Sequence, residues 1–236
     1  CYVQAAEKEM AEKNMADILV GNNKKKDIAQ ILEEYFAVKE EEQKVPLVSE
    51  VIDINHTKEY EDLTIHKVNE HTRAYIKIQD GCNQFCSYCI IPYTRGRIRS
   101  KNPEEVIEEV KNLAAQGYKE IVLTGIHLSS YGKDLGDITL LDVIQRIQQI
   151  EDIERIRLGS LEPRIITEQF VKELRACDKV CPHFHLSLQS GCDETLKRMN
   201  RKYTTEEYET ALNVLRTYYE HPALTTDVIA GFVGET

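Results

Sequence analysis

Three cysteines in one short stretch are the residues of this sequence best suited to chemistry. Cys82, Cys86 and Cys89 follow the spacing C-x3-C-x2-C within residues 81–89, GCNQFCSYC. Three thiolates on one loop can ligate three irons of a cubane iron–sulfur cluster, which leaves the fourth iron without a protein ligand. Structural zinc and iron–sulfur sites normally have four protein ligands, so this trio predicts an iron that binds something else. A zinc site completed by a distant ligand and three unrelated thiols are the alternative interpretations.

The composition limits the class of protein. The chain has 236 residues, of which 42% are hydrophobic and 30% charged, as in an ordinary globular protein of one or two domains. No apolar run reaches the roughly 18 residues of a membrane span and no signal-peptide pattern begins the chain, so we predict no membrane partner and a cytoplasmic location. Seven cysteines in a chain without an export signal indicate metal or redox chemistry rather than disulfides.

Two local basic clusters stand out against a net charge of −10. The overall charge argues against non-specific adhesion to nucleic acid, but a total hides local stripes. Residues 93–101 and 197–202 each carry four cations and no acid. They predict contacts with an RNA backbone, or else solvated faces and internal ion pairs. The predicted RNA-binding residues are Arg95, Arg97, Arg99, Lys197, Arg198 and Lys202.

Alternating strands and helices must position the cysteine loop. The apolar alternation of residues 73–79 predicts a strand that ends directly before the loop. Asn102 with Glu105, and Thr204 with Glu207, have the spacing of capping boxes at helix starts. The remaining periodicity predicts helices over 103–116, 140–150, 167–176 and from 204, and strands over 120–124, 153–158, 184–188 and 225–229.

This alternation predicts an α/β fold with a parallel sheet and right-handed crossovers. Periodicity alone leaves a doubly wound sheet and a barrel both open. Polar residues follow the predicted strands, among them Asp80, Thr124, Ser160, Ser187 and Asp227. Active sites of (β/α) barrels gather at the carboxyl ends of the strands. We therefore predict an incomplete (β/α) partial barrel with parallel strands, preceded by the end of a small α/β domain.

The sequence predicts three segments. Residues 1–37 contain a short strand, a turn and a helix, which we interpret as the C-terminal part of an N-terminal domain. Residues 38–70 lose the pattern and are predicted to be a linker. Residues 71–236 form the partial barrel, which ends after its fifth strand. Because the chain also lacks an initiator methionine, we expect it to be a fragment.

Four further motifs carry a family resemblance. They are RLGSLEP at 157–163, HLSLQSG at 185–191, LKRMNRKY at 196–203 and DVIAGFVGE at 227–235. With the cysteine loop they resemble the methylthiotransferase branch of the radical S-adenosylmethionine (SAM) enzymes, across essentially the whole chain. Within that branch, LTGIHL at 123–128 with SYG at 130–132 is most similar to the MtaB-type group, which modifies threonylcarbamoyladenosine in tRNA.

The resemblance implies a function and its cofactors. A 4Fe-4S cluster on Cys82, Cys86 and Cys89 would bind SAM and cleave it reductively, and a methylthio group would be added to threonylcarbamoyladenosine next to the anticodon. The implied partners are the tRNA anticodon loop and a flavodoxin- or ferredoxin-like electron donor. Relatives hold a second 4Fe-4S cluster, for which Cys1 is similar to the third ligand. The other two ligands and a C-terminal RNA-binding domain are absent from this sequence, so we expect incomplete turnover.

The resemblance also implies residues that hold the cofactor. Tyr88 corresponds to the residue that lies near the adenine. An acidic residue that relatives carry after the second barrel strand is missing here, which leaves the ligand of the SAM amino group open. His127, at the same strand end, is a weaker candidate, and Cys177 and Cys181 lack a third ligand for a metal. The cofactor-binding candidates are Tyr88, Thr124, Gly125, Ser160, Glu162, Ser187, Gln189, Arg201, Val228 and Ile229.

Two other functions are compatible with the same residues. The first is a methylthiotransferase that acts on another adenosine or on a protein side chain. The second is a non-catalytic RNA-binding module stabilised by a metal. Iron, sulfide and reductive cleavage of SAM distinguish the enzyme from the module, because a zinc module yields none of them.

Overall fold

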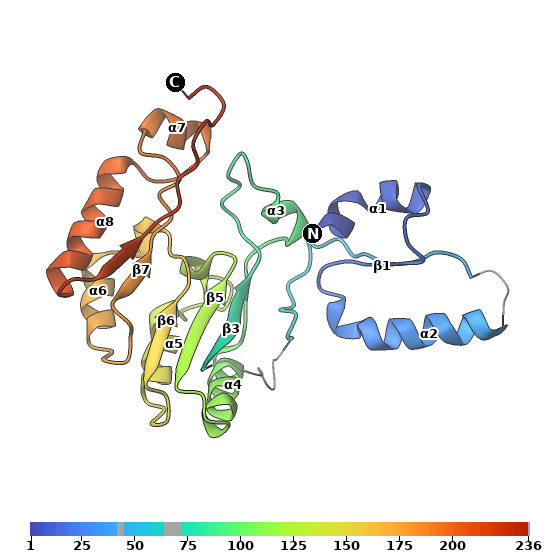
Figure 1. Ribbon diagram of the computed structural model, residues 1–236, viewed down its shortest axis with the longest axis horizontal. Coiled ribbons are helices and arrows are strands. Elements are labelled where there is room, and N and C mark those ends of the chain that lie inside the picture. The colour runs from blue at the N-terminus through green and yellow to red at the C-terminus, as the bar shows by residue number, and fades with distance from the viewer. Residues whose placement is uncertain (42–44, 64–71, 236) are drawn as a thin grey trace.

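The computed structural model describes residues 1–41, 45–63 and 72–235. A curved sheet with helices along one face forms the larger part, and a small N-terminal unit lies beside it (Figure 1). In the ranges described, none of the helices combines the length and the apolar character needed to cross a lipid bilayer.

The N-terminal unit pairs two short strands beside two helices. Helix α1 covers Tyr2–Glu12 and α2 covers Ile28–Glu41, preceded by the 3-10 turn η1 at Lys25–Asp27. Strand β1, Ile18–Val20, pairs in parallel with β2, Val48–Glu50.

This pairing departs from the predicted boundary at residue 37. Helix α2 continues to Glu41, and β2 comes from the segment predicted to be a linker. Residues 48–50 form a strand because their backbone groups pair with those of β1. Such pairing satisfies hydrogen-bonding groups that a linker would leave to solvent. The last part of the predicted linker and the predicted barrel start, residues 64–71, lie outside the described residues.

The main sheet has the order β4-β3-β5-β6, followed by a separate pair β7-β8. Strands β3, β5 and β6 are parallel, as are β7 and β8, whereas β4 runs antiparallel to β3. Single parallel bridges, Ile156 to Val180 and Leu161 to Leu186, connect the β6 side to the β7 side. The predicted parallel partial barrel is therefore confirmed. The strands are β3 Arg73–Asp80, β4 Arg99–Ser100, β5 Glu120–Gly125, β6 Arg155–Leu158, β7 His183–His185 and β8 Ala223–Thr225.

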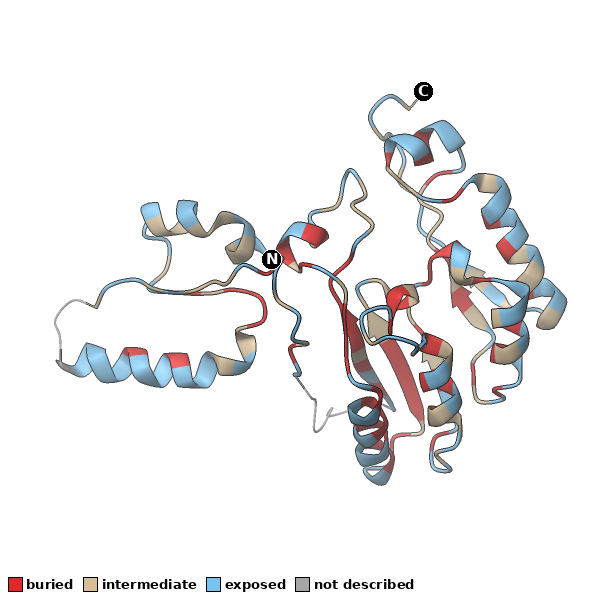
Figure 2. Cartoon of the chain, turned by 180° about the vertical axis from the view of Figure 1, so that it is seen from behind, coloured by how far each residue is buried: buried red, intermediate tan, exposed pale blue. Residues whose placement is uncertain are grey.

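The helices cover the outer face of this curved sheet. Helices α4, α5, α6 and α8 turn an apolar stripe toward the strands, and Figure 2 shows the buried residues on that side. On β3 the inward residues are Ala74, Ile76 and Ile78, each at most 1% exposed. The helices are α3 Ile91–Thr94, α4 Pro103–Ala115, α5 Leu140–Gln148, α6 Glu168–Arg175, α7 Asp193–Arg198 and α8 Thr205–Tyr218, with 3-10 turns η2 Leu128–Ser130 and η3 Pro163–Ile165.

Two local predictions differ in outcome. The capping box of Thr204 and Glu207 forms at the start of α8. At the start of α4 the Asn102 side chain accepts a hydrogen bond from the Glu104 backbone nitrogen, so the predicted partner Glu105 takes no part. An asparagine cap bonds the N–H group two residues along without needing a reciprocal acid.

The last predicted strand, 225–229, is wrong in its placement. Strand β8 ends at Thr225, and Val228 makes only a single bridge, to Gln189. Gln189 adopts φ +69°, a left-handed conformation that interrupts extended pairing. Val228 is consequently 60% exposed rather than part of the core.

Candidate functional site

The cysteine loop begins at a glycine that no other residue can replace without displacing backbone. Gly81 has φ +71°, and a Cβ added there would lie 1.8 Å from the carbonyl oxygen of Arg97. The Cys82 backbone nitrogen donates to the Gly96 carbonyl at 3.0 Å. The two ends of the segment 81–97 are therefore in contact, and this contact closes the loop that carries the cysteines.

Asp80 anchors the base of this loop. One of its carboxylate oxygens accepts a hydrogen bond from the Gly81 nitrogen at 2.8 Å. The other lies 3.1 Å from Lys77 Nζ and 3.5 Å from Arg95 Nη1. Burial acts to raise the pKa of Asp80, but Lys77 and Arg95 outweigh it and hold the pKa below its usual value. Asp80 is therefore a structural carboxylate that stays ionised.

Gln79 connects the cysteine loop to the end of β5, a role that the sequence analysis missed. Its side chain is fully buried, and Nε2 donates to the carbonyls of Asp80 and Gly81 at 2.8 and 2.7 Å. Its Oε1 accepts from the His127 backbone nitrogen at 2.7 Å. The available signal was a polar residue at the end of the predicted strand, shortly before the cysteines.

A second segment, far along the chain, holds the loop from its other side. The Ser87 backbone nitrogen donates to the Met199 carbonyl at 3.0 Å, and the Ser87 hydroxyl donates to the Arg198 carbonyl at 2.8 Å. Asn200 Nδ2 donates to the Phe85 carbonyl at 2.7 Å. The LKRMNRKY motif thus holds the cysteine loop through two backbone carbonyls and the Asn200 side chain.

Arg201 carries this contact into the site itself. Its Nη1 lies 3.3 Å from Cys86 Sγ, and its Nε donates to the Tyr203 hydroxyl at 3.0 Å. The Tyr203 hydroxyl lies 2.8 Å from the Leu188 carbonyl, so Tyr203 ties Arg201 to the backbone after β7. Burial acts to lower the pKa of Arg201, but Tyr203 and Cys86 raise it further. A permanently charged guanidinium therefore faces a thiol of the loop.

The three thiols line one cavity of about 150 Å³. Cys82 is buried and Cys86 and Cys89 are half-buried, all unbonded to other sulfurs. Burial, and then the neighbouring Cys86 and Cys89, raise the pKa of Cys82. The other lining residues include five predicted cofactor contacts. These are Tyr88, Ser160, Glu162, Ser187 and Arg201.

This donor set fits a polynuclear cluster better than a single ion. Across residues 1–41, 45–63 and 72–235, no three His, Cys, Asp or Glu side chains are arranged to hold one metal ion. A single zinc needs its thiolates within about 2.3 Å of one point, whereas an iron–sulfur cluster spreads its ligands over several irons. Three thiols around one cavity with an adjacent guanidinium meet the second requirement.

His127 and Glu162 also line the cavity. His127 Nδ1 lies 2.6 Å from the Ser130 hydroxyl, while Nε2 is buried without a hydrogen-bond partner and lies 3.6 Å from a Glu162 oxygen. The other Glu162 oxygen accepts from Arg164 Nε at 2.9 Å. Burial lowers the pKa of His127, with partial compensation from Glu162. The cavity therefore offers a free imidazole nitrogen and a buried carboxylate to a ligand.

Thr124 and Gly125, predicted to contact the cofactor, make contacts within the sheet. The Thr124 hydroxyl donates to the Ile76 carbonyl at 3.1 Å. A Cβ at Gly125 would lie 2.9 Å from Cβ of Gln79, its partner in the β3–β5 pairing. Neither residue lines the cysteine cavity.

Gln189, Val228 and Ile229 are brought together by backbone hydrogen bonds. The Gln189 nitrogen donates to the Asp227 carbonyl at 2.9 Å, and the Ile229 nitrogen donates to the Gln189 carbonyl at 2.8 Å. None of the three is among the residues that line the cysteine cavity.

The first basic cluster separates into three environments. Arg95 is half-buried in its ion pair with Asp80, and Arg97 is exposed with its guanidinium 4.6 Å from the Phe85 ring centre. Arg99 is only 1% exposed, with Nη1 donating to the Arg97 carbonyl at 3.1 Å. The prediction that Arg99 contacts RNA is therefore wrong, because β4 pairs with β3 and turns that side chain inward.

The second basic cluster remains on the surface. Lys197, Arg198 and Lys202 are exposed. Arg198 Nη2 donates to the Thr195 hydroxyl at 3.0 Å, and Lys202 Nζ donates to Asn200 Oδ1 at 2.6 Å. These neutral partners leave all three charges available to an anion.

The other cysteines are dispersed. Cys1 is exposed at the start of α1, which packs against α3 directly after the cysteine loop (Figure 1). Cys177 is buried, and its thiol lies 3.8 Å from the Glu173 carbonyl. Cys181 is half-buried and Cys192 is exposed.

Comparison with known proteins gives a family match. Residues 76–236 match the model described as the radical SAM superfamily. The threonylcarbamoyladenosine tRNA methylthiotransferase MtaB of Bacillus subtilis is 40% identical over all of this chain and 51% of its own length. A tRNA-2-methylthio-N(6)-dimethylallyladenosine synthase of a Thermoanaerobacter species is 48% identical over 72% of this chain and 36% of its own length. The chain spans about half the length of the curated MtaB relatives it matches.

Solved structures support the fold. The radical S-adenosylmethionine methyltransferase TsrM of Kitasatospora setae aligns with a TM-score of 0.51 at 21% identity, over 65% of this chain and 30% of its own. The cobalamin-dependent radical enzyme OxsB aligns with a TM-score of 0.56 at 14% identity, over 78% of this chain and 27% of its own. At these identities the likeness shows a common barrel architecture.

Proposed function

Because this chain belongs to the radical SAM superfamily, we propose that it contains the catalytic centre of a tRNA methylthiotransferase. The observation that carries the proposal is the joint lining of one cavity by Cys82, Cys86, Cys89 and Arg201. The radical SAM family uses a 4Fe-4S cluster and SAM, and the three thiols are the ligands for that cluster. When bound, the cluster supplies the electron for reductive cleavage of SAM.

The side chains of the cavity bind and orient the cofactor in this proposal. Arg201 and the Glu162 carboxylate carry opposite charges on the same cavity, so they suit the carboxylate and the amino group of a zwitterionic methionine. Ser160 and Ser187 offer hydroxyl groups to the ribose. Tyr88 is 41% exposed and packs edge-on against Phe232, which leaves one aromatic face for an adenine ring.

The remaining predicted contacts stay as weaker proposals. Gln189, Val228 and Ile229 would contact the adenine through backbone groups. Thr124 and Gly125 would act through the backbone, because the Thr124 hydroxyl is already bonded to the sheet.

We propose a tRNA anticodon loop as substrate and threonylcarbamoyladenosine as the modified base. The MtaB names of relatives aligned over the whole chain, together with the LTGIHL and SYG motifs, support this choice. Dimethylallyladenosine, in the names of other relatives, one of them also aligned over the whole chain, is the alternative base. A single-stranded loop can present one splayed base to a pocket.

Cys1 is proposed as one ligand of a second 4Fe-4S cluster, as the family resemblance implies. Cys1 lies at the start of α1, and α1 packs against α3. Cys1 is therefore on the side of the N-terminal unit that faces the cysteine loop. A flavodoxin- or ferredoxin-like protein is the proposed electron donor.

The test uses stem-loop RNAs that differ only in the modified adenosine. The complete protein is reconstituted anaerobically with iron, sulfide and SAM, and the RNA is analysed by nucleoside mass spectrometry. We expect a methylthio mass increase on threonylcarbamoyladenosine and little on dimethylallyladenosine. Cleavage of SAM without modification of either RNA would retain the radical chemistry and reject the tRNA substrate.

A further inference from the structure

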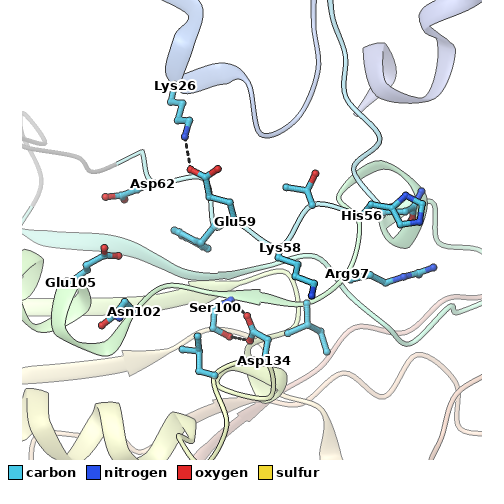
Figure 3. A pocket seen from close by; sticks show the side chains of 15 residues that line it. Lys26, His56, Lys58, Glu59, Asp62, Arg97, Ser100, Asn102, Glu105 and Asp134 are labelled. Carbon is cyan, nitrogen blue, oxygen red and sulfur yellow. Dashed lines mark hydrogen bonds and ion pairs between the residues drawn. The ribbon is translucent and has the colours of Figure 1, made fainter.

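A cleft of about 850 Å³ lies apart from the cysteine cavity. One wall is the segment 55–62, and the other is the β4 edge with the start of α4 and the 134–135 turn (Figure 3). It shares no lining residue with the cysteine cavity. The volume is within the range of about 300–1,000 Å³ typical of ligand sites.

Charges of both signs line this cleft: the cations Lys26, Lys58 and Arg97 and the acids Glu59, Asp62, Glu105 and Asp134. Figure 3 shows His56, Lys58 and Arg97 toward one end, and Asn102 and Glu105 toward the other. A ligand that matches this arrangement is anionic at one end and offers hydrogen-bond donors at the other. A nucleotide has both, in its phosphate and in its sugar hydroxyl and base amino groups.

Two cations at the basic end have no counter-charge. His56 pairs with Asp53 at 2.7 Å, and Lys26 on the cleft wall pairs with Glu59 at 2.6 Å. Lys58 makes no hydrogen bond or ion pair with any residue of the described chain, and the Arg97 guanidinium makes no ion pair there. Of the acids in the lining, Glu59 and Asp62 are paired with Lys26 and Lys101, and Asp134 accepts hydrogen bonds from Ser100. Lys58 and Arg97 can therefore meet an anionic group of a ligand.

Arg97 also joins the cleft to the cysteine loop. Its guanidinium lies 4.6 Å from the ring centre of Phe85, which stands between Cys82 and Cys86 in sequence. The Phe85 ring meets Tyr93 edge-on at 5.6 Å, and Tyr93 is 62% exposed. Phe85 and Tyr93 line neither cavity, but Arg97 lines the cleft and contacts Phe85, so the aromatic pair adjoins the Arg97 side of the cleft.

We propose that the cleft binds the RNA strand that flanks the modified nucleoside, with Lys58 and Arg97 on a backbone phosphate and Tyr93 against a base. The inference rests on the proposed RNA substrate. Aromatic stacking beside a basic groove is a recurring way to bind a single strand without reading its sequence. Glu105 at the far end of the cleft can accept a hydrogen bond from a sugar hydroxyl or a base amino group and disfavours a second phosphate there.

Binding of a fluorescently labelled anticodon stem-loop to the full chain tests the proposal. Lys58→Gln and Arg97→Gln should each weaken binding about threefold to tenfold, and the slope of log K against log salt should fall by about one for each. Lys172→Gln is the matched control, because Lys172 is an exposed lysine on α6, away from the cleft. Its affinity should equal that of the unaltered chain.

A stem-loop with one neutral methylphosphonate linkage identifies the phosphate. At the contacted position, this linkage should weaken binding of the RNA to the unaltered chain. The Lys58→Gln variant should bind the neutral-linkage RNA as well as it binds the ordinary RNA. Normal RNA affinity in both cleft variants would overturn the inference while retaining the RNA substrate. Failure of the unaltered chain to bind RNA would reject the proposed function itself. Displacement of RNA by polyglutamate at equal charge concentration would assign the cleft to an acidic protein and overturn the inference as well.

Discussion

Arg201 Nη1 and Cys86 Sγ lie 3.3 Å apart although 115 residues separate them in the sequence. The guanidinium is held in place by Tyr203, through a 3.0 Å hydrogen bond and a cation–π contact of 4.9 Å. Iron is ligated by the thiolate form of cysteine, and a guanidinium can donate a charge-assisted hydrogen bond to such a ligand. The contact thus links the cofactor cavity to the cluster ligands.

Arg201→Gln should weaken retention of the cluster. Loss of a charge-assisted hydrogen bond costs about 1.5–3 kcal/mol, or about tenfold to a hundredfold in affinity. Iron and sulfide per chain after anaerobic gel filtration measure the effect. Arg201→Lys keeps the charge without the planar fork, so it should restore part of the iron content. Equal iron content in all three proteins would show that Arg201 plays no part in holding the cluster.

Gly81→Ala should destabilise the chain much more than Gly136→Ala. Both glycines have a left-handed φ, +71° and +87°, but only Gly81 has a neighbour, the Arg97 carbonyl, in the way of a Cβ. The conformational cost common to both is about 1–2 kcal/mol, and the clash should add about 1–3 kcal/mol. Urea unfolding under anaerobic conditions gives both values. Matching losses would mean that the loop can shift away from the new methyl group.

Gln79→Ala should reduce the free energy of unfolding by about 2–3 kcal/mol, since it leaves buried backbone groups of Asp80, Gly81 and His127 unpaired. The exposed Gln145 on α5 provides the control Gln145→Ala, for which we expect a change below about 0.5 kcal/mol. Chemical denaturation measures both. A loss at Gln79 no larger than the control would indicate that water replaces these hydrogen bonds.

His127 should make stability depend on pH. Burial holds the pKa of His127 below its usual value of 6.5, so below pH 6.5 the unfolded chain binds a proton that the folded chain does not. Stability is therefore full above about pH 6.5 and falls as the pH drops toward the lowered pKa.

The comparison with His127→Asn isolates this contribution. The free energy of unfolding of the unaltered chain, minus that of His127→Asn, should decrease between about pH 7 and pH 5. His183, whose pKa burial also lowers, is present in both proteins and cancels. A difference that grows as the pH falls would mean that Glu162 controls the proton on His127.

The strands and helices of the barrel could be predicted because the patterns that indicate them involve residues close together in the sequence. Apolar alternation at 73–79 and the cap at Thr204 appear as β3 and as the start of α8. The sequence also predicted that Ser160, Glu162 and Ser187 lie near the cysteines, because the carboxyl ends of parallel strands meet at one edge of a sheet.

Contacts that depend on tertiary packing could not be read in this way. Arg99 and Arg97 look equivalent in sequence, yet pairing of β4 with β3 buries one and leaves the other exposed. The hydrogen bonds of Gln79 to the His127 nitrogen and of Asn200 to the cysteine loop join segments far apart in the sequence, whose approach depends on how the sheet is assembled. No spacing rule encodes that distance.

Electron paramagnetic resonance of the reduced protein, before and after addition of SAM, tests most directly whether three thiols leave one iron open. We predict a 4Fe-4S signal that requires Cys82, Cys86 and Cys89, and that changes when SAM is added because the open iron gains a ligand. A signal that SAM leaves unchanged, or a protein that binds zinc in place of iron, would contradict the account.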